Sequence, residues 1–326
     1  MEVTTSSAPG KAILFGEHAV VYGRPAIAVP VSELRARATV TASAPGSGCT
    51  ILAADLNHRL ALDTAPADDP LAHIVRLTLA QLGIGPDPDW SITLRSEIPI
   101  SSGLGSGAAV STAIARALAE HAGHELSPEA VSALVYETER LHHGTPSGID
   151  NAVVAHEQPV YFVRGEPLRP LMVGADIWLL IADTGIASAT KVAVAEVRRG
   201  WQADPTHYER LFDAIGGIVE AARQAIQKGR VDELSGLMDE NQRCLAAIGV
   251  SSPLLDELCA AAREAGAGGA KLSGAGRGGN LIALVTPTTA TAVSGALLAA
   301  GAKSCILSRV ARRPVTEAVS TDCSRP

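Results

Sequence analysis

Apolar and polar residues alternate along two segments in the first third of the chain. The segment LRARATVTAS, residues 34–43, has an apolar side chain at every second position, and WSITLRSEIPI, residues 90–100, behaves in the same way. A period of two is typical of a strand that buries one face and exposes the other. We therefore expect a β-strand in each segment.

Apolar residues recur at helical spacing in three further segments. In residues 68–84 this pattern includes Asp69 and Pro70, a pair that is typical of a capped helix start. Residues 108–121 predict an alanine-rich helix, and Ser127 precedes another that extends to about residue 143. Helices are therefore expected on both sides of the second predicted strand.

A long helical region follows the strands of the middle of the chain. Strands are expected within residues 159–164 and 176–185, and apolar spacing then favours helices from about residue 188 to 266. Residues 289–300 predict one more helix, and residues 303–311 predict a last strand. The change to mostly helical structure predicts a domain boundary near residue 172.

The composition agrees with two globular domains, which we place at residues 1–171 and 172–326. The chain has 326 residues, 47% of them hydrophobic, and this is enough for two cores of ordinary size. The formal net charge of −7 argues against a nucleic-acid or anionic-membrane surface, since either needs clustered lysine and arginine. The N-terminus lacks a signal-peptide pattern, and no apolar run reaches the roughly 18 residues of a membrane span. We therefore expect a cytoplasmic protein.

Three glycines, Gly103, Gly105 and Gly107, come directly before the helix predicted at residues 108–121. Glycine lets a backbone approach a ligand closely, and a helix N-terminus presents unpaired N–H groups, so the segment favours a phosphate site. A tight strand-to-helix turn is the alternative. The chain has no GxxxxGK followed by Ser or Thr, and the run GAGRGG at residues 274–279 precedes a strand-like segment where a dinucleotide fold needs a helix.

Two other segments and this second glycine-rich run accompany the loop. APGKAILFGEHAVVYG at residues 8–23, SSGLGSGAA at 101–109, GTPSGIDNAV at 144–153 and KLSGAGRGGN at 271–280 follow one another in this order. Together they resemble the GHMP kinases, a superfamily of small-molecule kinases, and the first and third are most similar to its mevalonate kinase branch. The resemblance extends over nearly the whole chain.

The resemblance implies two α+β domains, an N-terminal one like ribosomal protein S5 domain 2 and a helix-rich, ferredoxin-like C-terminal one. It implies that the γ-phosphoryl group of ATP passes to the 5-hydroxyl of mevalonate, which gives 5-phosphomevalonate and ADP in isoprenoid biosynthesis. Mg²⁺ accompanies ATP, because the phosphates need a hard cation, and a homodimer is an assembly found among such kinases. Two alternatives stay open: a GHMP kinase for phosphomevalonate or a sugar, and a non-catalytic metabolite sensor with this fold.

Asp150 and Lys11 correspond to the catalytic pair of the family. The resemblance places the Asp150 carboxylate at the substrate hydroxyl, which it deprotonates or orients, while Lys11 keeps that carboxylate ionised and offsets charge on the phosphoryl group. Taken alone, Asp150 is a turn residue and Lys11 an exposed residue on a strand edge. The resemblance assigns ATP binding to Ser101, Ser102, Gly103, Leu104, Gly105, Ser106, Gly107 and Ala108.

The magnesium ligands of the family match this chain only in part. Glu139 corresponds to the magnesium-binding glutamate, and its alternative is a solvated helix carboxylate paired with Arg140 or His143. The family loop GLGSSAA has a second serine that binds the metal, and Gly107 occupies that position here. Glycine offers no side-chain oxygen, so we expect Ser106 or an additional water molecule to replace the missing ligand.

Two residues match family positions at the substrate pocket, and one departs from the family. His18 and Thr190 are suited to hydrogen-bond a small hydroxy acid, although His18 is equally a structural histidine bonded to backbone, and Thr190 a first-turn helix residue. Arg277 occupies a position that is usually glycine. We expect its side chain either to reach phosphate or to point to solvent.

Overall fold

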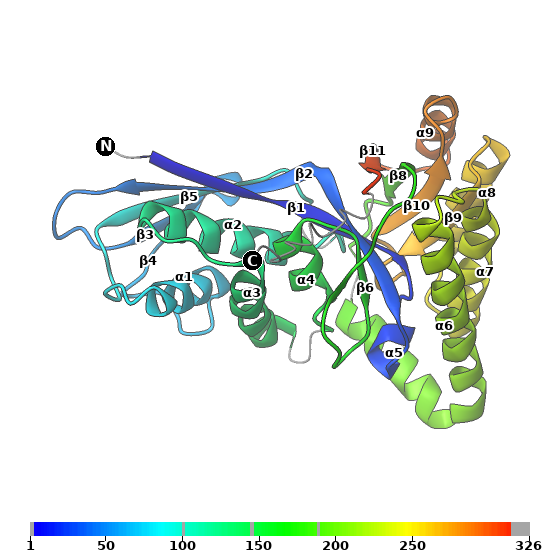
Figure 1. The fold of residues 1–326 in the computed structure, drawn as a ribbon, viewed down its shortest axis with the longest axis horizontal. Coiled ribbons are helices and arrows are strands. Elements are labelled where there is room, and N and C mark those ends of the chain that lie inside the picture. The colour runs from blue at the N-terminus through cyan, green and yellow to red at the C-terminus, as the bar shows by residue number, and fades with distance from the viewer. Residues whose placement is uncertain (1–2, 100–101, 144–146, 188–189, 314–326) are drawn as a thin grey trace, which may run out of the picture.

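The computed structural model describes residues 3–99, 102–143, 147–187 and 190–313. Figure 1 shows an elongated molecule in which a large sheet with helices on one side adjoins a second sheet that is flanked by long helices. Both α-helices and predominantly antiparallel strands are present, and this confirms the predicted α+β class. In the described part of the chain, no helix is long and apolar enough to cross a membrane.

The first sheet has the strand order β4-β3-β5-β2-β6-β7, and β1 pairs with β2. Its long strands β1 and β2 run antiparallel along much of their length and extend toward the second sheet (Figure 1). The strand predicted at residues 34–43 falls in β2 except for its last residue, and the one predicted at 90–100 contains β5. The strands are β1 Val3–Phe15, β2 Ala26–Ala42, β3 Thr50–Ala53, β4 His58–Ala61, β5 Trp90–Ser96, β6 Val160–Phe162 and β7 Arg169–Pro170.

Four helices accompany this sheet: α1 Pro70–Gln81, α2 Ser106–His121, α3 Pro128–His143 and α4 Ile149–His156. The predicted helix start is confirmed in α1, where the Asp69 side chain accepts a hydrogen bond from the Ala72 N–H. Helix α2 packs against β1 and β2, and its many alanines are almost completely buried because small side chains permit close packing. The packing fixes the N-terminus of α2 relative to β1.

The second sheet has the order β11-β8-β10-β9, with all neighbours antiparallel. Its strands are β8 Ile177–Asp183, β9 Gly269–Ser273, β10 Asn280–Val285 and β11 Ser304–Val310. The helical region is confirmed as α5 Thr190–Ala203, α6 Pro205–Gln227, α7 Glu233–Ile248 and α8 Pro253–Glu264, and α9 Ala290–Ala299 follows later. Strands β9 and β10 are buried along their whole length. The proposed boundary at residues 171/172 falls between β7 and β8 and stays a prediction.

One helix differs from the sequence-based prediction. We expected Asp150 on a turn, whereas the structure places it in the first turn of α4, directly after Gly148 in the left-handed conformation. Almost every residue of α4 is buried, so its sequence shows no polar face. A short apolar run of this kind cannot be assigned to a helix from periodicity.

Candidate active site

Lys11 and Asp150 form an ion pair where β1 meets the start of α4. The Lys11 Nζ atom lies 2.9 Å from Asp150 Oδ1, and the two side chains are 5% and 33% exposed. The backbone N–H of Lys11 donates to the Leu104 carbonyl at 2.9 Å, so the same residue also fixes the glycine loop. Lys11 is therefore not an exposed residue on a strand edge, and the ammonium lies where it stabilises an ionised Asp150.

Glu139 lies close to this pair, near the end of α3. Burial raises the pKa of Glu139 to about 7, the Asp150 carboxylate adds to the rise, and Lys11 opposes it. Arg140, one partner named in the solvated alternative, forms its ion pair with Glu137, and the side chain of His143, the other partner, lies outside the described residues. A Cβ atom built on Gly107 would lie 3.1 Å from Glu139 Oε1. The carboxylate thus faces the first turn of α2 at the position where the family has its second serine.

The glycine loop brings the N-terminus of α2 to the same place. Gly103 and Gly105 have φ angles of 86° and 72°, a region that favours glycine, and a Cβ atom on Gly105 would lie 2.9 Å from Lys11 Cγ. The N-terminal cap of α2 is Gly105 and forms no side-chain hydrogen bond with the helix. Gly105 has no side chain that could cap the first N–H groups of α2, which favours an anion site at this helix start.

The other predicted loop residues lie at this turn with one exception. Ser106, Gly107 and Ala108 form the first turn of α2, and Leu104 is buried beneath it. Ser102 precedes them, and its hydroxyl donates to the Pro99 carbonyl at 2.9 Å. Ser101 lies outside the described residues. No group of three or more His, Cys, Asp or Glu side chains that could hold a metal is present in the described part of the chain.

Residues near β9 and β10 hold the glycine loop and β1 from the other domain. The Asn280 side-chain amide donates to the Ser102 carbonyl, and the Ser273 hydroxyl donates to the Ile13 carbonyl at 2.9 Å. Asn280 ends the motif KLSGAGRGGN, and the motif alone does not assign it this contact. A polar residue at the start of an otherwise apolar strand was the available signal.

Glu17 and Lys271 form a second ion pair across the two sheets, and both side chains are completely buried. Lys271 also donates to the Leu272 carbonyl at 2.7 Å. Burial raises the pKa of Glu17, and it lowers the pKa of Lys271. Burying two charges costs desolvation, and removing either partner leaves the other charge uncompensated. This pair fixes the loop after β1 against β9.

The Arg277 side chain is 42% exposed, which agrees with the solvent alternative, and it also has partners that the sequence did not indicate. Its guanidinium forms an ion pair with Glu196 of α5 and donates to the Gly249 carbonyl at 3.0 Å. Arg277 has a φ angle of 59°, and its N–H donates to the Val250 carbonyl at 2.9 Å. This backbone directs the side chain to the C-terminal end of α7, where a cation is favourable.

The two predicted substrate residues differ in their surroundings. His18 is buried, and its Nε2 atom lies 3.0 Å from the Ala275 carbonyl, which is the structural role named as its alternative. Thr190 begins α5 and is exposed, and residues 188–189 before it lie outside the described part. Contact of either residue with a substrate stays a prediction.

The burial of His18 predicts a specific dependence of stability on pH. Burial lowers the pKa of His18 from 6.5 to about 4. Between these two pH values the His18 imidazole is protonated in the unfolded chain and neutral in the folded chain. Stability is therefore complete above pH 6.5 and falls as the pH drops toward 4. Relative to pH 7, we expect this group to cost about 2 kcal/mol of unfolding free energy at pH 5.

Urea unfolding of His18→Asn at pH 7 and pH 5 measures this contribution. Asparagine tolerates the positive φ angle of 61° and does not titrate, so the variant should lose less stability than wild type over this interval. His124→Asn, at an exposed histidine, should behave as wild type does. An identical pH dependence of wild type and His18→Asn would contradict the prediction.

Two family models match the chain. GHMP kinases N terminal domain matches residues 71–157, which include the glycine loop, Glu139 and Asp150. GHMP kinases C terminal matches residues 222–303, which include Lys271 and Asn280. The residues that form the candidate site therefore come from both matched regions and from β1.

Curated relatives are similar over most of their length. The mevalonate kinase of Pyrococcus horikoshii is 37% identical over 300 residues, which cover 86% of this chain and 88% of that protein. The mevalonate kinase of Thermococcus sibiricus is 34% identical over 313 residues, and the coverage is 91% and 93%.

Solved structures agree in fold. A crystal structure of L. major mevalonate kinase in complex with R-mevalonate has a TM-score of 0.82 at 30% identity and covers 95% of this chain and 96% of that chain. A Streptococcus pneumoniae phosphomevalonate kinase in complex with phosphomevalonate and AMPPNP has a TM-score of 0.79 at 17% identity, with coverage of 94% and 99%. The second likeness shows the fold alone.

Proposed function

The chain belongs to the GHMP kinases, and within them to the mevalonate kinases, and from this premise we propose how it performs ATP-dependent phosphorylation of mevalonate. The 5-hydroxyl of mevalonate attacks the γ-phosphorus of ATP, the bond from that phosphorus to the bridging oxygen breaks, and 5-phosphomevalonate and ADP leave. The observation that carries the proposal is the Lys11–Asp150 pair beside the uncapped N-terminus of α2.

Asp150 and Lys11 have different roles at the reacting atoms. The Asp150 carboxylate accepts a hydrogen bond from the substrate hydroxyl and takes its proton as the bond to phosphorus forms, while Lys11 lowers the cost of negative charge on the transferred phosphoryl oxygens. Little base strength is needed, because the transition state of phosphoryl transfer is loose. The pair therefore acts mainly by orientation and electrostatics.

The residues at the start of α2 are suited to ATP and Mg²⁺. Backbone N–H groups of Ser106, Gly107 and Ala108 favour the triphosphate, and the oxygen donors beside them are Glu139 and the Ser106 hydroxyl. Mg²⁺ is commonly held by one or two protein oxygens, substrate phosphates and water, so this donor set fits it even without a serine at position 107. When bound, Mg²⁺ neutralises charge on the β- and γ-phosphates.

Glu139→Gln should weaken Mg²⁺ binding and at the same time stabilise the fold in the absence of metal. We expect affinity for Mg²⁺ in the presence of ATP to fall about 100-fold. In EDTA the variant should unfold at a higher temperature than wild type, because it no longer ionises a buried carboxylate. With a folded pKa of about 7 against 4.5 in the unfolded chain, wild type loses stability as the pH rises between these values.

Thermal unfolding in EDTA at pH 5 and pH 8, together with Mg²⁺ titration of ATP turnover, checks this prediction. The gain in unfolding temperature should be larger at pH 8 than at pH 5. Glu137→Gln, two residues earlier on the exposed side of α3, is the matched control and should change neither Mg²⁺ affinity nor this pH dependence. A variant with wild-type Mg²⁺ affinity would remove Glu139 from the proposed metal site.

ADP release with MgATP and a panel of mevalonate, phosphomevalonate, homoserine and galactose tests the function. We expect turnover with mevalonate only. A phosphorylated substrate needs additional cations at the pocket, and Arg277, one candidate, is engaged with Glu196. Turnover with another alcohol would replace the substrate, and ATP binding without turnover would favour a sensor. A cytoplasmic location, a homodimer, no contact with nucleic acid or membrane, and domains at 1–171 and 172–326 stay predictions.

A further inference from the structure

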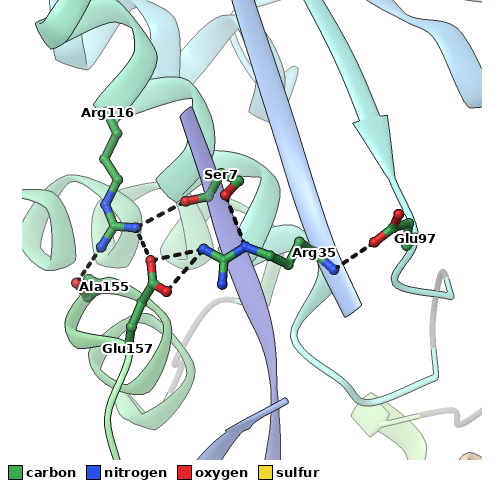
Figure 2. Close-up of polar contacts among 6 residues, drawn as sticks. All are labelled: Ser7, Arg35, Glu97, Arg116, Ala155 and Glu157. Atoms are coloured by element: carbon green, nitrogen blue, oxygen red, sulfur yellow. Dashed lines mark hydrogen bonds and ion pairs between the residues drawn. The ribbon is translucent and has the colours of Figure 1, made fainter. Parts of the chain in front are cut away.

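A carboxylate held by two arginines lies at the far end of α4 from Asp150. Glu157 accepts hydrogen bonds from Arg35 at 3.1 and 3.0 Å and forms an ion pair with Arg116 (Figure 2). Arg116 also donates to the Ala155 carbonyl at 2.7 Å. Arg35 donates from Nε to the Ser7 hydroxyl at 2.9 Å, and Arg116 donates to the Ser7 carbonyl at 3.1 Å. We call Ser7, Arg35, Arg116 and Glu157 the Glu157 cluster.

The Glu157 cluster joins the elements that carry the candidate site. Ser7 lies on β1, four residues before Lys11, and Arg116 lies on α2, the helix that begins at the glycine loop. Glu157 is the C-terminal cap of α4, whose first turn carries Asp150. Arg35 adds β2. A shift of α4 along its axis therefore changes the Lys11–Asp150 geometry and strains the cluster at the same time.

The backbone conformation of Glu157 is one that the surrounding contacts must hold in place. Glu157 has φ 48° and ψ 39°, the left-handed conformation that usually falls to glycine at the end of a helix. A non-glycine residue is disfavoured in this conformation and persists there when the surrounding contacts determine it. A glycine would satisfy the backbone but would leave Arg35 and Arg116 without their shared carboxylate.

The Glu157 cluster differs from an ordinary surface ion pair in the number and arrangement of its charges. One partly buried carboxylate faces two guanidinium groups, and each guanidinium has a second acceptor that fixes its plane. Forked donors of this kind hold a carboxylate in one orientation, which a single ammonium does not do. The short helix α4 spans only 8 residues, so restraint at its C-terminal end reaches its first turn through two helical turns.

We propose that Glu157 is a positioning residue, which sets α4 and hence Asp150 against Lys11 through Arg35 and Arg116. This inference rests on the proposed function for the acceptor used in the assay and for the role of Asp150 in turnover. A displacement of about 1 Å at the reacting atoms is enough to lower a rate by up to about 10²-fold. The one substrate contact that moves is that of Asp150 with the reacting hydroxyl, so we expect the effect mainly on turnover and little on binding.

Steady-state kinetics of Glu157→Gln tests the inference. The amide turns a donor toward an arginine, so we expect kcat to fall about tenfold while KM for mevalonate and for MgATP stays within about twofold. Arg116→Lys, which keeps the charge but not the fork, should show the same split if Glu157→Gln folds poorly. Amide hydrogen exchange in residues 149–153 should become faster in both variants.

Asp239→Asn provides the matched control. Asp239 is 34% exposed, close to the 33% of Glu157, and its carboxylate accepts from Arg263 at 2.9 Å and from the Ala270 N–H at 3.2 Å in the other domain. This variant should lose comparable stability with unchanged kcat. Unchanged kcat in folded Glu157→Gln, or equal losses in both carboxylate variants, would overturn the inference.

The outcomes for substrate and for positioning are separate. Wild-type turnover on the acceptor panel reports on the proposed function, and the ratio of variant to wild type on the accepted alcohol reports on Glu157. If wild type turns over no acceptor, the proposed function fails, and exchange in residues 149–153 decides the inference alone. Wild-type exchange there in both variants would then overturn it.

Discussion

Asp150→Asn should lower kcat for mevalonate by about 10³- to 10⁴-fold, while the protein remains folded. The amide is nearly isosteric with the carboxylate, but it cannot accept the proton of the substrate hydroxyl, and general-base catalysis is worth roughly 10²- to 10⁴-fold. The amide also removes the charge that faces Lys11 at 2.9 Å. We place the loss at the upper end of this range because both effects act at the same atom.

Asp176→Asn is the control for this substitution. Asp176 has the same side-chain exposure as Asp150, 33%, and pairs with Arg309 at 2.8 Å away from the glycine loop. Single-turnover measurements at saturating ATP and mevalonate should show the full loss for Asp150→Asn and none for Asp176→Asn. A loss below tenfold for Asp150→Asn would mean that the carboxylate neither deprotonates nor orients the hydroxyl.

Lys11→Met should lower kcat by about 10²- to 10³-fold with a small effect on stability. Methionine retains the aliphatic stem that packs against Gly105 and removes the ammonium that stabilises charge on the transferred phosphoryl group, a contribution typically of this size. The substitution also leaves Asp150 and Glu139 without the cation between them. Because Lys11 lowers the pKa of Glu139, the variant should need a higher pH to bind Mg²⁺ fully.

Lys271 is buried like Lys11 and serves as the comparison, because its replacement should mainly lower stability. Lys271→Met leaves the Glu17 carboxylate completely buried without its partner, which typically costs about 3–5 kcal/mol of stability. Urea unfolding and pre-steady-state kinetics on both variants distinguish the two roles. If Lys11→Met lost stability as Lys271→Met does while retaining kcat, Lys11 would be structural.

The sequence was sufficient where a local pattern and a motif coincided. Asp69 and Pro70 marked the start of α1, and the period-two segments marked β2 and β5. The motifs placed Lys11, Glu139 and Asp150 together, and the structure brings these three side chains into one site. Their spacing along the chain alone could not do so, because the contacts join three separate elements.

The remaining features depend on tertiary structure. Helix α4 was missed because almost all of its residues are buried. The partners of Arg277 were not predicted, because its backbone conformation directs the side chain to Glu196. The pairing of Glu17 with Lys271 joins residues 254 positions apart, and neither residue carries a local signal of its partner. A charged residue in an apolar segment predicts a partner but does not identify it.

The Glu17–Lys271 pair also bears on how the two halves of such a protein can be recombined. A chimera that takes residues 1–171 from one kinase and the remainder from another inherits each charge from a different parent. If only one parent has the pair, the product buries an uncompensated ion at the junction. The two halves are therefore not interchangeable modules, although each has its own sheet, and any exchange between them must transfer both members of the pair together.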